Sequence, residues 1–531
     1  MLELNMEALN MSHPSHLGRA YESRVKDLLI SCQAADNEFN VNGINIDNVL
    51  VTGLSTNSQD VEPGDVFIAL NGLNTRGHDF IDRAIDKGAV AIFADTDGMF
   101  SLRYQLNKQV FFIPNLALHL SRMASCFYRE PSQQLSVVGI TGTNGKTSCS
   151  HFVASLASGI GRQGAVIGTL GYGPYPHSSE RPLVETGFTT PDAVQLQSCL
   201  ADLQTQAVDL VALEVSSHAL SQCRADAVAF NVAVLTNLSR DHLDFHQDML
   251  SYAKAKRKLF SFSCLDAAII NIDDEFGLSI SEQRPSHLVC LSYSLKNSEA
   301  DIYAYQTNYK ANSIETRVKT PYGEGSLQLP FVGQFNLSNA LAALGALLIS
   351  GYPLKDLLRA FSTVPMIPGR MEVVSYSGLV PDKEQPLVVV DYAHTPEALE
   401  LALTTLRDHS TGHVWCVFGC GGDRDHGKRA TMGRIAHQLA DQIIVTSDNP
   451  RSELAEQIID DILLGIEDMQ GVFVEQDRSA AIAFAVQHAT QNDVILIAGK
   501  GHEQFQLINN EKIPFSDVAV AQNFLQLRAS L

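Results

Sequence analysis

Short apolar runs recur along almost the whole chain, and segments with helical spacing separate them. Such runs are typical of buried strands, and their alternation with helices predicts parallel sheets covered by helices. The first series of strand-like runs comprises residues 48–51, 65–70, 89–94 and 110–113, with a helical stretch at 80–87. This series predicts a small α/β unit over residues 26–130, preceded by an N-terminal extension over residues 1–25.

Two further series of the same kind follow. The second comprises residues 135–140, 164–167, 210–215, 229–235 and 267–270, and the third comprises 387–390, 413–418, 442–445, 472–475 and 493–497. Pro365, Pro368 and Gly369 interrupt the pattern between these two series. We therefore expect a central domain over 131–365 and a C-terminal domain over 366–531. Because ligands of parallel sheets bind beyond the carboxyl ends of the strands, these ends are where functional residues are expected.

A glycine-rich segment, GTNGKTS at 142–148, follows the first strand of the central series and opens a helix. Backbone N–H groups and the helix N-terminus converge there on one point and attract anionic oxygen. Lys146 can reach terminal phosphates, and the Thr147 hydroxyl can ligate Mg²⁺. The common P-loop pattern is not fully matched, because Ile140 stands where its first glycine is expected. A plain glycine-rich turn would leave the charged Lys146 unexplained, so the segment predicts an ATP phosphate site.

Overall charge narrows the possible partners. The chain has 38 Lys and Arg against 59 Asp and Glu, for a formal charge of −21, which argues against nucleic acid as a partner. Nine cysteines without a CxxC pair fit reduced thiols better than a disulfide framework or a zinc site. The N-terminal residues lack the pattern of a secretory leader, and no long apolar stretch suits a membrane span. We expect a cytoplasmic protein without membrane insertion.

Polar residues stand at the ends of two more strands of the central series. Glu214 ends one strand, and His242 follows the next. A carboxylate and an imidazole on the same sheet edge as the phosphate loop can hold Mg²⁺, although each alone is equally typical of a loop cap or a core histidine. The basic stretch YAKAKRK at 252–258 is typical of a solvated helix face, unless one lysine points inward to the phosphate site.

The C-terminal series carries polar, glycine-bearing tips after its strands. These tips are DYAHTP at 391–396, GCGGDRD at 419–425, DNPR at 448–451 and GKGHE at 499–503. Arg424 and Arg451 can each bind a carboxylate through paired hydrogen bonds, while Asp448 and Glu503 can hold an ammonium. Loop capping and surface ion pairs would explain any one tip but hardly all of them. A row of strand tips that carries both positive and negative side chains suits a zwitterionic amino acid.

Together these motifs resemble those of the Mur ligases of peptidoglycan synthesis, and they occur in the same order. The resemblance covers about residues 45–531 and rests on GTNGKTS, EVSSHAL, TNLSRDHLD, FNLSNA, PGRME, DYAHTP, FGCGGDRD, DNPR and GKGHE. It implies the three-domain Mur ligase architecture, with a P-loop ATPase-like central sheet and a Rossmann-like C-terminal domain. GTNGKT also occurs in folylpolyglutamate synthases, whereas DNPR is associated in this family with diaminopimelate rather than lysine.

The resemblance also implies roles for single residues. Those matching ATP-binding positions are Gly142, Thr143, Asn144, Gly145, Lys146, Thr147, Ser148, Asn336, Arg370 and Asp391. Those matching positions for a UDP-muramoyl dipeptide are Ser58, Leu73, Asn74, Thr75, Thr189, Thr190, Ser216, Gln222 and Arg224. Those matching diaminopimelate positions are Arg424, Asp448, Asn449, Pro450, Arg451, Gly499 and Glu503. Phe188 and Ser148 depart from the family pattern as we know it.

Catalysis in this family implies two Mg²⁺ sites, one held by Thr147 and Glu214 and the other by His242 and Lys256. The lysine that Lys256 matches is carbamylated by CO₂, which turns a cation into a metal-binding carboxylate. Lys146, Glu214, His242 and Lys256 are thus the implied catalytic residues. The implied reaction is ATP-dependent: a D-glutamyl carboxylate becomes an acyl phosphate, and the amine of meso-diaminopimelate attacks it.

Two alternatives stay open at this stage. One is a ligase of the same class that uses lysine or extends folates, against which the DNPR arginine argues, since the extra carboxylate of diaminopimelate needs a cation. The other is a nucleotide-dependent switch without ligase chemistry. We expect a monomer whose domains close over the substrates, because the amine site and the acyl phosphate arise from different domains.

Overall fold

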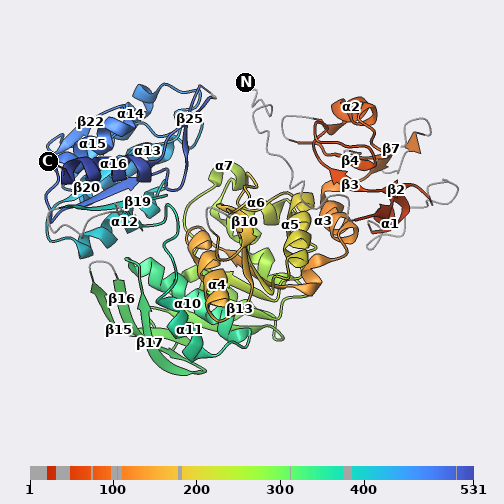
Figure 1. Ribbon diagram of the computed structural model, residues 1–531, viewed down its shortest axis with the longest axis horizontal. Coiled ribbons are helices and arrows are strands. Elements are labelled where there is room, and N and C mark those ends of the chain that lie inside the picture. Colours follow the sequence, from red (N-terminus) through yellow and green to blue (C-terminus); the bar gives the residue numbers. More distant parts are fainter. Residues whose placement is uncertain are drawn as a thin grey trace.

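The structure is a computed structural model that describes residues 21–31, 48–72, 76–96, 104–105, 110–177, 182–310, 313–374, 385–509 and 511–530. Three large sheets organise these residues, and each forms the centre of its own lobe (Figure 1). The lobes follow one another along the molecule, with the central lobe between the other two. The predicted α/β class and order of units are confirmed, and the exact domain bounds stay predictions.

The N-terminal lobe contains a five-stranded sheet in the order β3-β4-β5-β7-β6. The strands are β3 Gly53–Ser55, β4 Asp65–Ala69, β5 Ala91–Asp95, β6 Tyr104–Gln105 and β7 Val110–Ile113, and a separate pair joins β1 Ser23–Arg24 to β2 Leu50–Val51. The helices are α1 Val25–Ser31, η3 Gly77–Phe80, α2 Ile81–Asp86 and α3 Leu116–Phe127. All pairs in the five-stranded sheet except β6–β7 are parallel, as the alternating pattern predicts.

The central lobe is built on a ten-stranded sheet in the order β10-β9-β11-β8-β12-β13-β14-β15-β16-β17. Its strands are β8 Ser136–Thr141, β9 Gly164–Gly168, β10 Gly171–Pro174, β11 Leu210–Glu214, β12 Val232–Leu235, β13 Ala267–Asn271, β14 Val289–Ser294, β15 Ile302–Lys310, β16 Ser313–Thr320 and β17 Gly323–Leu329. Its helices are η4 Pro131–Gln134, α4 Lys146–Gly159, α5 Ala193–Thr205, α6 Ser217–Ser221, α7 Leu243–His246, α8 Met249–Arg257, η5 Lys258–Ser261, α9 Glu275–Gln283, α10 Gln334–Ile349 and α11 Leu354–Phe361. The parallel strands β9, β11, β8, β12 and β13 bring their carboxyl ends to one edge.

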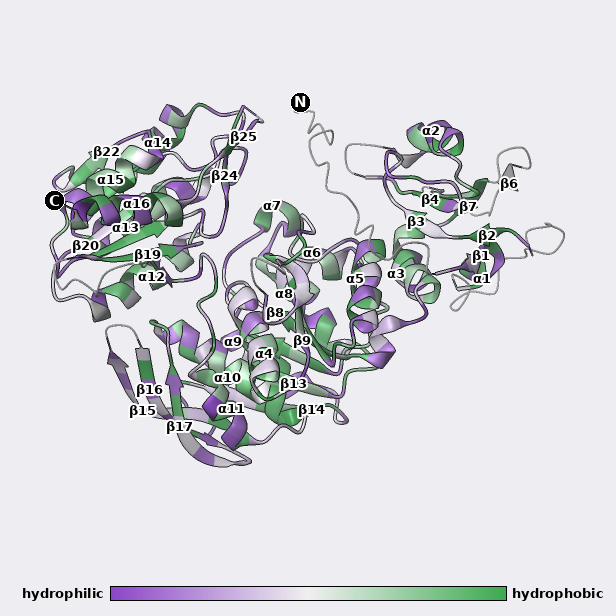
Figure 2. Ribbon diagram, in the orientation of Figure 1, coloured by the Kyte–Doolittle hydropathy of each residue, from purple (hydrophilic) through white to green (hydrophobic). Residues whose placement is uncertain are grey.

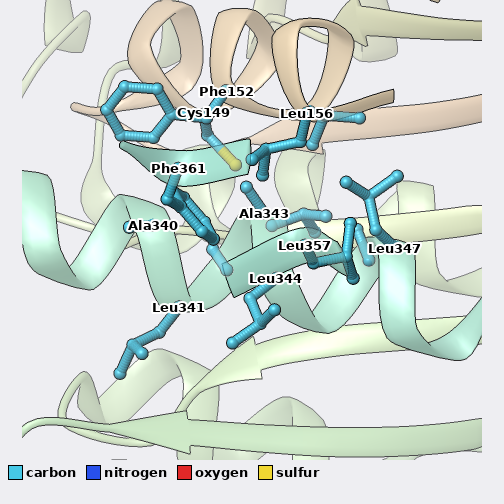
Figure 3. Close-up of a cluster of buried hydrophobic side chains, with 14 of the residues drawn as sticks. Cys149, Phe152, Leu156, Ala340, Leu341, Ala343, Leu344, Leu347, Leu357 and Phe361 are labelled. Carbon is cyan, nitrogen blue, oxygen red and sulfur yellow. The ribbon is translucent and has the colours of Figure 1, made fainter. Parts of the chain in front are cut away.

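The core under this edge is an apolar layer between helices. Phe152 and Leu156 of α4 meet Leu344 and Leu347 of α10 and Leu357 of α11 (Figure 3). All five side chains are fully buried, and the contact fixes the helix that follows the phosphate loop against the sheet. The hydropathy colouring shows the same division, with apolar residues along the buried elements and polar ones at the lobe surfaces (Figure 2).

The C-terminal lobe has a six-stranded sheet in the order β18-β19-β23-β20-β21-β22. Its strands are β18 Glu372–Val373, β19 Leu387–Asp391, β20 Val414–Phe418, β21 Gln442–Val445, β22 Val472–Val474 and β23 Val494–Ala498, with a hairpin of β24 Phe505–Ile508 and β25 Glu511–Pro514. Its helices are α12 Pro396–His409, α13 Gly427–Leu439, α14 Ala455–Leu463, α15 Arg478–His488 and α16 Asp517–Ala529. The strands from β19 to β22 in sheet order are parallel, so the tips after β19, β20, β21 and β23 lie along one edge.

The antiparallel extension β15–β16–β17 and the hairpin β24–β25 were not predicted. β16 reads SIETRVKT, in which buried and exposed residues alternate, the pattern of a half-buried antiparallel strand rather than a fully apolar run. A search for continuous apolar runs passes over such strands.

In the described part of the chain, no helix combines the length and apolar character that a membrane crossing requires.

Candidate active site

The phosphate loop begins where β8 ends and closes at the first residue of α4. Gly142 and Gly145 have φ angles of 154° and 86°, in the region that favours glycine. A Cβ at Gly142 would meet the Thr236 hydroxyl, and one at Gly145 would meet the Asn339 side chain. The amide N–H of Asn144 donates to the side-chain oxygen of Asn237 at 2.9 Å. The neighbouring strand end therefore holds the loop in a shape that exposes its backbone to a ligand.

Lys146 lies over this loop. Its ammonium donates to the carbonyl oxygens of Gly142 and Thr143, both at 2.8 Å. Burial lowers the pKa of Lys146, and the nearby carboxylates of Glu214 and Asp241 act in the opposite direction. The ammonium group therefore lies at the phosphate loop, where its positive charge can stabilise anionic oxygens of a ligand.

Thr147 and Glu214 lie in contact, the pair that the resemblance to the Mur ligases implies. The Thr147 hydroxyl donates to Glu214 Oε2 at 3.0 Å, and the backbone N–H of Thr169 donates to Oε1 at 3.0 Å. Glu214 is only 1% exposed. The hydroxyl and carboxylate are hard oxygen donors next to the phosphate loop, so they fit a Mg²⁺ ion.

Lys256 points inward, whereas Lys254 on the same helix is exposed. The Lys256 ammonium donates to the Gly142 carbonyl at 2.7 Å and lies 4.6 Å from the centre of the Tyr252 ring. Burial lowers the pKa of Lys256 well below its ordinary value, and the Lys146 ammonium adds to this effect. An amine held in this way is readily uncharged, which is the form that reacts with CO₂.

His242 lies near Tyr252 and His218. Its ring centre lies 6.1 Å from that of Tyr252 and 4.8 Å from that of His218. His242 has a φ of 54°, and its Nε2 is 3.3 Å from the Asp241 carboxylate. Among the described residues, no three His, Cys, Asp or Glu side chains gather into a metal-ligand set. Carbamylation of Lys256 would bring a further carboxylate to the Tyr252 ring, which His242 also contacts.

The hinge segment connects the C-terminal lobe to the phosphate loop. Arg370 donates to the Thr147 hydroxyl at 3.2 Å, and its guanidinium lies 4.6 Å from the centre of the Tyr392 ring. Burial raises the pKa of Asp391, although Arg370 acts to lower it. Within the described residues, Arg370 Nε and His502 Nδ1 are buried without a hydrogen-bond partner. Because Arg370 also contacts Thr147 at the phosphate loop, its unpaired nitrogen fits a nucleotide that would pair with it.

Asn336, which the resemblance assigns to ATP, donates to the Val332 carbonyl at 2.8 Å. Asn339, three residues further along α10, is the asparagine that lies against Gly145. Asn339 was not among the residues predicted to bind the nucleotide. The FNLSNA motif contains both asparagines at helical spacing, and that spacing was the available signal.

The residues predicted for the UDP-muramoyl end are partly brought together. The Thr190 hydroxyl donates to the Glu214 carbonyl at 2.8 Å and accepts from the Ser216 N–H at 2.9 Å. Arg224 donates to the Thr190 carbonyl at 3.0 Å, bonds Gln222, and lies 5.4 Å from the exposed Phe188 ring. Thr189 accepts a hydrogen bond from Thr169 at 3.1 Å. Ser58 is buried in the N-terminal lobe and is not part of this cluster. Leu73, Asn74 and Thr75 lie outside the described residues.

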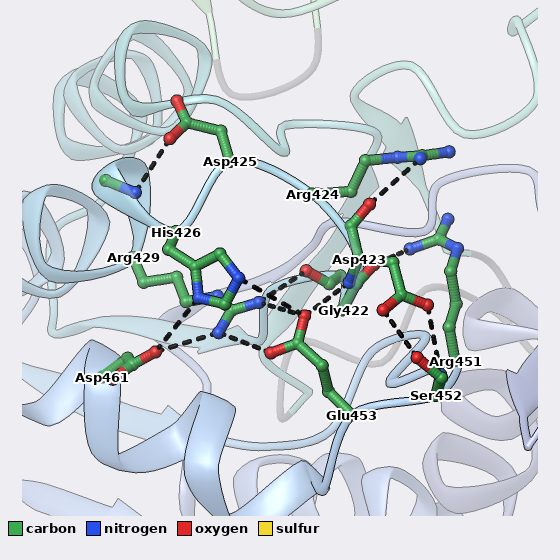
Figure 4. Close-up of polar contacts among 12 residues, drawn as sticks. Gly422, Asp423, Arg424, Asp425, His426, Arg429, Arg451, Ser452, Glu453 and Asp461 are labelled. Carbon is green, nitrogen blue, oxygen red and sulfur yellow. Dashed lines mark hydrogen bonds and ion pairs between the residues drawn. The ribbon is translucent and has the colours of Figure 1, made fainter. Parts of the chain in front are cut away.

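The strand tips of the C-terminal lobe are tied to one another. Arg451 donates to the Gly422 carbonyl at 2.7 Å, and Arg424 donates to the Asp423 carbonyl at 3.2 Å (Figure 4). Behind them, the buried Arg429 forms paired hydrogen bonds with Glu453 at 2.9 Å. This network holds the arginine tips after β20 and β21 side by side.

A cavity of about 590 Å³ opens between the central and C-terminal lobes. The predicted residues that line it are His242, Arg424, Asp448, Asn449, Arg451, Gly499 and Glu503. Lys146 and Lys256 are not among its lining residues. The cavity therefore joins the His242 tip of the central sheet to the amino-acid tips of the C-terminal sheet.

Other lining residues were not singled out, namely Tyr392, His394 and Lys428. His394 Nδ1 lies 2.8 Å from the Tyr392 carbonyl, and Lys428 donates to the His394 carbonyl at 2.9 Å. Burial lowers the pKa of His394, and Lys428 adds to the effect. The DYAHTP motif after β19 was the signal for Tyr392 and His394, whereas Lys428 lies on α13 with no motif of its own.

Comparisons with known proteins agree with this geometry. Three family models match: the Mur ligase family catalytic domain at residues 50–128, the Mur ligase middle domain at 140–347, and the Mur ligase glutamate ligase domain at 369–501. The chain is 43% identical over 482 residues to the UDP-N-acetylmuramoyl-L-alanyl-D-glutamate--2,6-diaminopimelate ligase of Coxiella burnetii, covering 90% of this chain and 96% of the relative. It is 44% identical over 480 residues to the protein of the same name from Pseudomonas aeruginosa, covering 90% and 96%.

Solved structures give the same result. A structure of a UDP-N-acetylmuramoyl-L-alanyl-D-glutamate--2,6-diaminopimelate ligase has a TM-score of 0.63 at 36% identity and covers 90% of this chain and 95% of its own. MurF from Acinetobacter baumannii has a TM-score of 0.64 at 19% identity, covering 90% and 96%, and this similarity concerns the fold alone. The family matches and the identity to full-length relatives establish that this chain belongs to the Mur ligase family.

Proposed function

We propose that this chain is an ATP-dependent amide ligase of peptidoglycan precursor synthesis. It adds meso-diaminopimelate to the D-glutamate of UDP-N-acetylmuramoyl-L-alanyl-D-glutamate and releases ADP and phosphate. The observation that carries the proposal is the cavity between the lobes. In it, His242 of the central lobe lies opposite Arg451 of the DNPR motif and Glu503, both of the C-terminal lobe. The names of the relatives that match over nearly the whole chain support the same substrates.

The first chemical step makes the D-glutamyl carboxylate reactive. A carboxylate is a poor electrophile, so its oxygen attacks the γ-phosphorus of ATP, the bond to the β-phosphate breaks, and an acyl phosphate and ADP result. The loop N–H groups and Lys146 offset the charge of the crowded phosphate oxygens. Thr147 and Glu214 would hold Mg²⁺, which supplies further positive charge for the same purpose.

The second step forms the amide bond. The tips after β20, β21 and β23 present diaminopimelate through Arg424, Arg451 and Glu503, with its free amine toward the acyl phosphate. The amine attacks the acyl carbon, the C–O bond to phosphate breaks, and inorganic phosphate leaves with the proton that the amine nitrogen loses. Closure of the lobes over this cavity would exclude water, which would otherwise hydrolyse the acyl phosphate.

Carbamylation of Lys256 is part of the proposal. The uncharged amine of Lys256 forms a bond to the carbon of CO₂ and loses a proton, which gives a carboxylate next to Tyr252 and His242. The buried position and lowered pKa of Lys256 support this reaction, because they favour the uncharged amine. With His242, the carbamate would hold a second Mg²⁺.

The proposal also includes the domain bounds 26–130, 131–365 and 366–531, a cytoplasmic location and a monomeric state. Eight of the cysteines lie in the described residues, and the structure joins none of these eight in a disulfide. Sedimentation of the purified protein tests the monomeric state directly.

Substrate-dependent ADP release tests the proposed function. The purified enzyme with ATP and Mg²⁺ should release ADP only when both the UDP-linked dipeptide and meso-diaminopimelate are present. Lysine in place of diaminopimelate should support much slower release. If diaminopimelate adds nothing to turnover, the substrate assignment is wrong, and if neither amino acid matters the nucleotide-switch alternative gains support.

Replacement of Arg451 by alanine should raise the KM for diaminopimelate by about tenfold to hundredfold, with little change in the KM for ATP. A charge-assisted hydrogen bond is worth roughly 1.5–3 kcal/mol, and each 1.4 kcal/mol is about a factor of ten. Steady-state kinetics with each substrate varied in turn measure the two KM values. Arg434→Ala, at an exposed position on α13, is the matched control. Equal effects on both KM values would contradict a role in amino-acid binding.

A further inference from the structure

Lys500 is a fully buried cation that the mechanism has not used. It stands between Gly499 and Gly501 in the turn after β23, with none of its surface exposed. Its ammonium donates to Asn449 Oδ1 at 2.9 Å and to Glu503 Oε2 at 2.8 Å, and lies 3.9 Å from Asp448 Oδ1. All three partners line the cavity between the lobes, whereas Lys500 stands behind them.

These contacts fix the orientation of the groups that face the cavity. Asn449 accepts from Lys500 and from the Leu507 N–H at 2.9 Å, which leaves its amide nitrogen to donate to Glu503 Oε2 at 2.8 Å. Both hydrogen bonds that the Glu503 carboxylate accepts from the described residues thus fall on Oε2. The other oxygen, Oε1, is left for a ligand in the cavity that Glu503 lines.

The charge of Lys500 matters as much as its geometry. Asp448, after β21, and Glu503, after β23, are two carboxylates that line the same cavity, and together they would repel a ligand with an additional carboxylate. One ammonium behind them offsets part of that negative potential and still leaves them able to bind an amino group. A cation buried among hydrogen-bond acceptors is costly to place, so it is best explained by what it does for the groups around it.

We propose that Lys500 is a positioning residue that orients Asn449 and Glu503 and offsets the carboxylate charge, so that the tip accepts an amino acid carrying a second carboxylate. The inference rests on the proposed function, and it assigns Lys500 a part in discrimination between diaminopimelate and lysine. Diaminopimelate differs from lysine by one carboxylate at the far end. Loss of the Lys500 charge should therefore weaken the binding of diaminopimelate more than the binding of lysine.

Lys500→Met and Lys500→Gln, compared with the wild-type enzyme, test the inference. Methionine removes the charge and both hydrogen bonds, while glutamine removes the charge and can still donate to one of the two partners. We expect both variants to raise the KM for meso-diaminopimelate by about tenfold or more, from the loss of charged hydrogen bonds. The ratio of kcat/KM for diaminopimelate to that for lysine should fall in both, while the KM for ATP stays within about twofold.

Lys512→Met is the matched control. The Lys512 and Lys500 ammonium groups both lie near the Phe505 ring, at 4.6 and 5.9 Å, but Lys512 is exposed on β25. It should leave the selectivity ratio unchanged. If Lys500→Met fails to fold, Lys500→Gln carries the test, and circular dichroism with the KM for ATP shows that the fold is intact. Wild-type selectivity in either folded variant would overturn the inference and leave the proposed function standing. A wild-type enzyme without diaminopimelate-dependent turnover would instead overturn the proposed function.

Discussion

Replacement of Lys146 by alanine should slow ADP release by on the order of 10³-fold, with substrate binding affected far less. Its ammonium already lies at the mouth of the phosphate loop, 2.8 Å from each of two loop carbonyls. When the γ-phosphoryl group moves to the D-glutamyl carboxylate, negative charge builds up among oxygens that converge on this point. Because the site is buried, a positive charge there is worth much more than in water.

Single-turnover measurement of acyl phosphate and ADP formation separates this effect from product release. Lys355→Ala, at an exposed position on α11 of the same lobe, is the control and should behave as wild type. Burial lowers the pKa of Lys146, so its removal should not destabilise the fold, and a thermal unfolding curve checks this. A Lys146→Ala enzyme with more than about a tenth of wild-type turnover would show that the loop backbone alone is sufficient.

The local parts of this site could be predicted from the sequence because each follows a strand in a recognisable pattern. Glu214 and Lys146 come directly after apolar runs, and parallel strands bring such ends to one edge. Hydrophobic periodicity therefore predicted that Glu214 lies at the sheet edge of the phosphate loop, whereas its pairing with Thr147 was implied by the resemblance to the Mur ligases. The inward position of Lys256 was harder to predict from the sequence, since a run of basic residues is typical of a solvated helix face. Its spacing of four residues from the buried Tyr252 was the available signal.

Contacts between distant segments could not be predicted in this way. Arg370 meets Thr147 across 223 residues of chain, and no local pattern encodes how one lobe sits on another. The same holds for Lys500, which a sequence reading treats as part of a glycine-rich turn. Its importance follows only from the side chains that the fold places around its ammonium. Alternating strands such as β16 were missed because their apolar positions do not form continuous runs.

Replacement of Lys256 by methionine should lower turnover by on the order of 10²- to 10³-fold and yet not lower the stability of the protein. The loss of activity is expected because methionine cannot become a carbamate, and His242 alone is a poor site for Mg²⁺. Formate or acetate, each a small carboxylate, should restore part of the activity. Lys254→Met, two residues away on the same helix but exposed, should keep full activity and show no response to formate.

The stability of the same variant supplies an independent readout. Burial lowers the pKa of Lys256 well below 10.5, so the unfolded chain binds a proton at this residue over a pH range in which the folded chain does not. Stability then rises with pH through that range, and at neutral pH the folded protein bears a cost. In CO₂-free buffer, Lys256→Met should therefore unfold at a higher temperature than wild type at pH 7, with the difference shrinking toward pH 10. Added bicarbonate should raise the unfolding temperature of the wild type alone, because carbamylation removes that cost. Full turnover in Lys256→Met, or equal bicarbonate effects on both proteins, would rule out the carbamate.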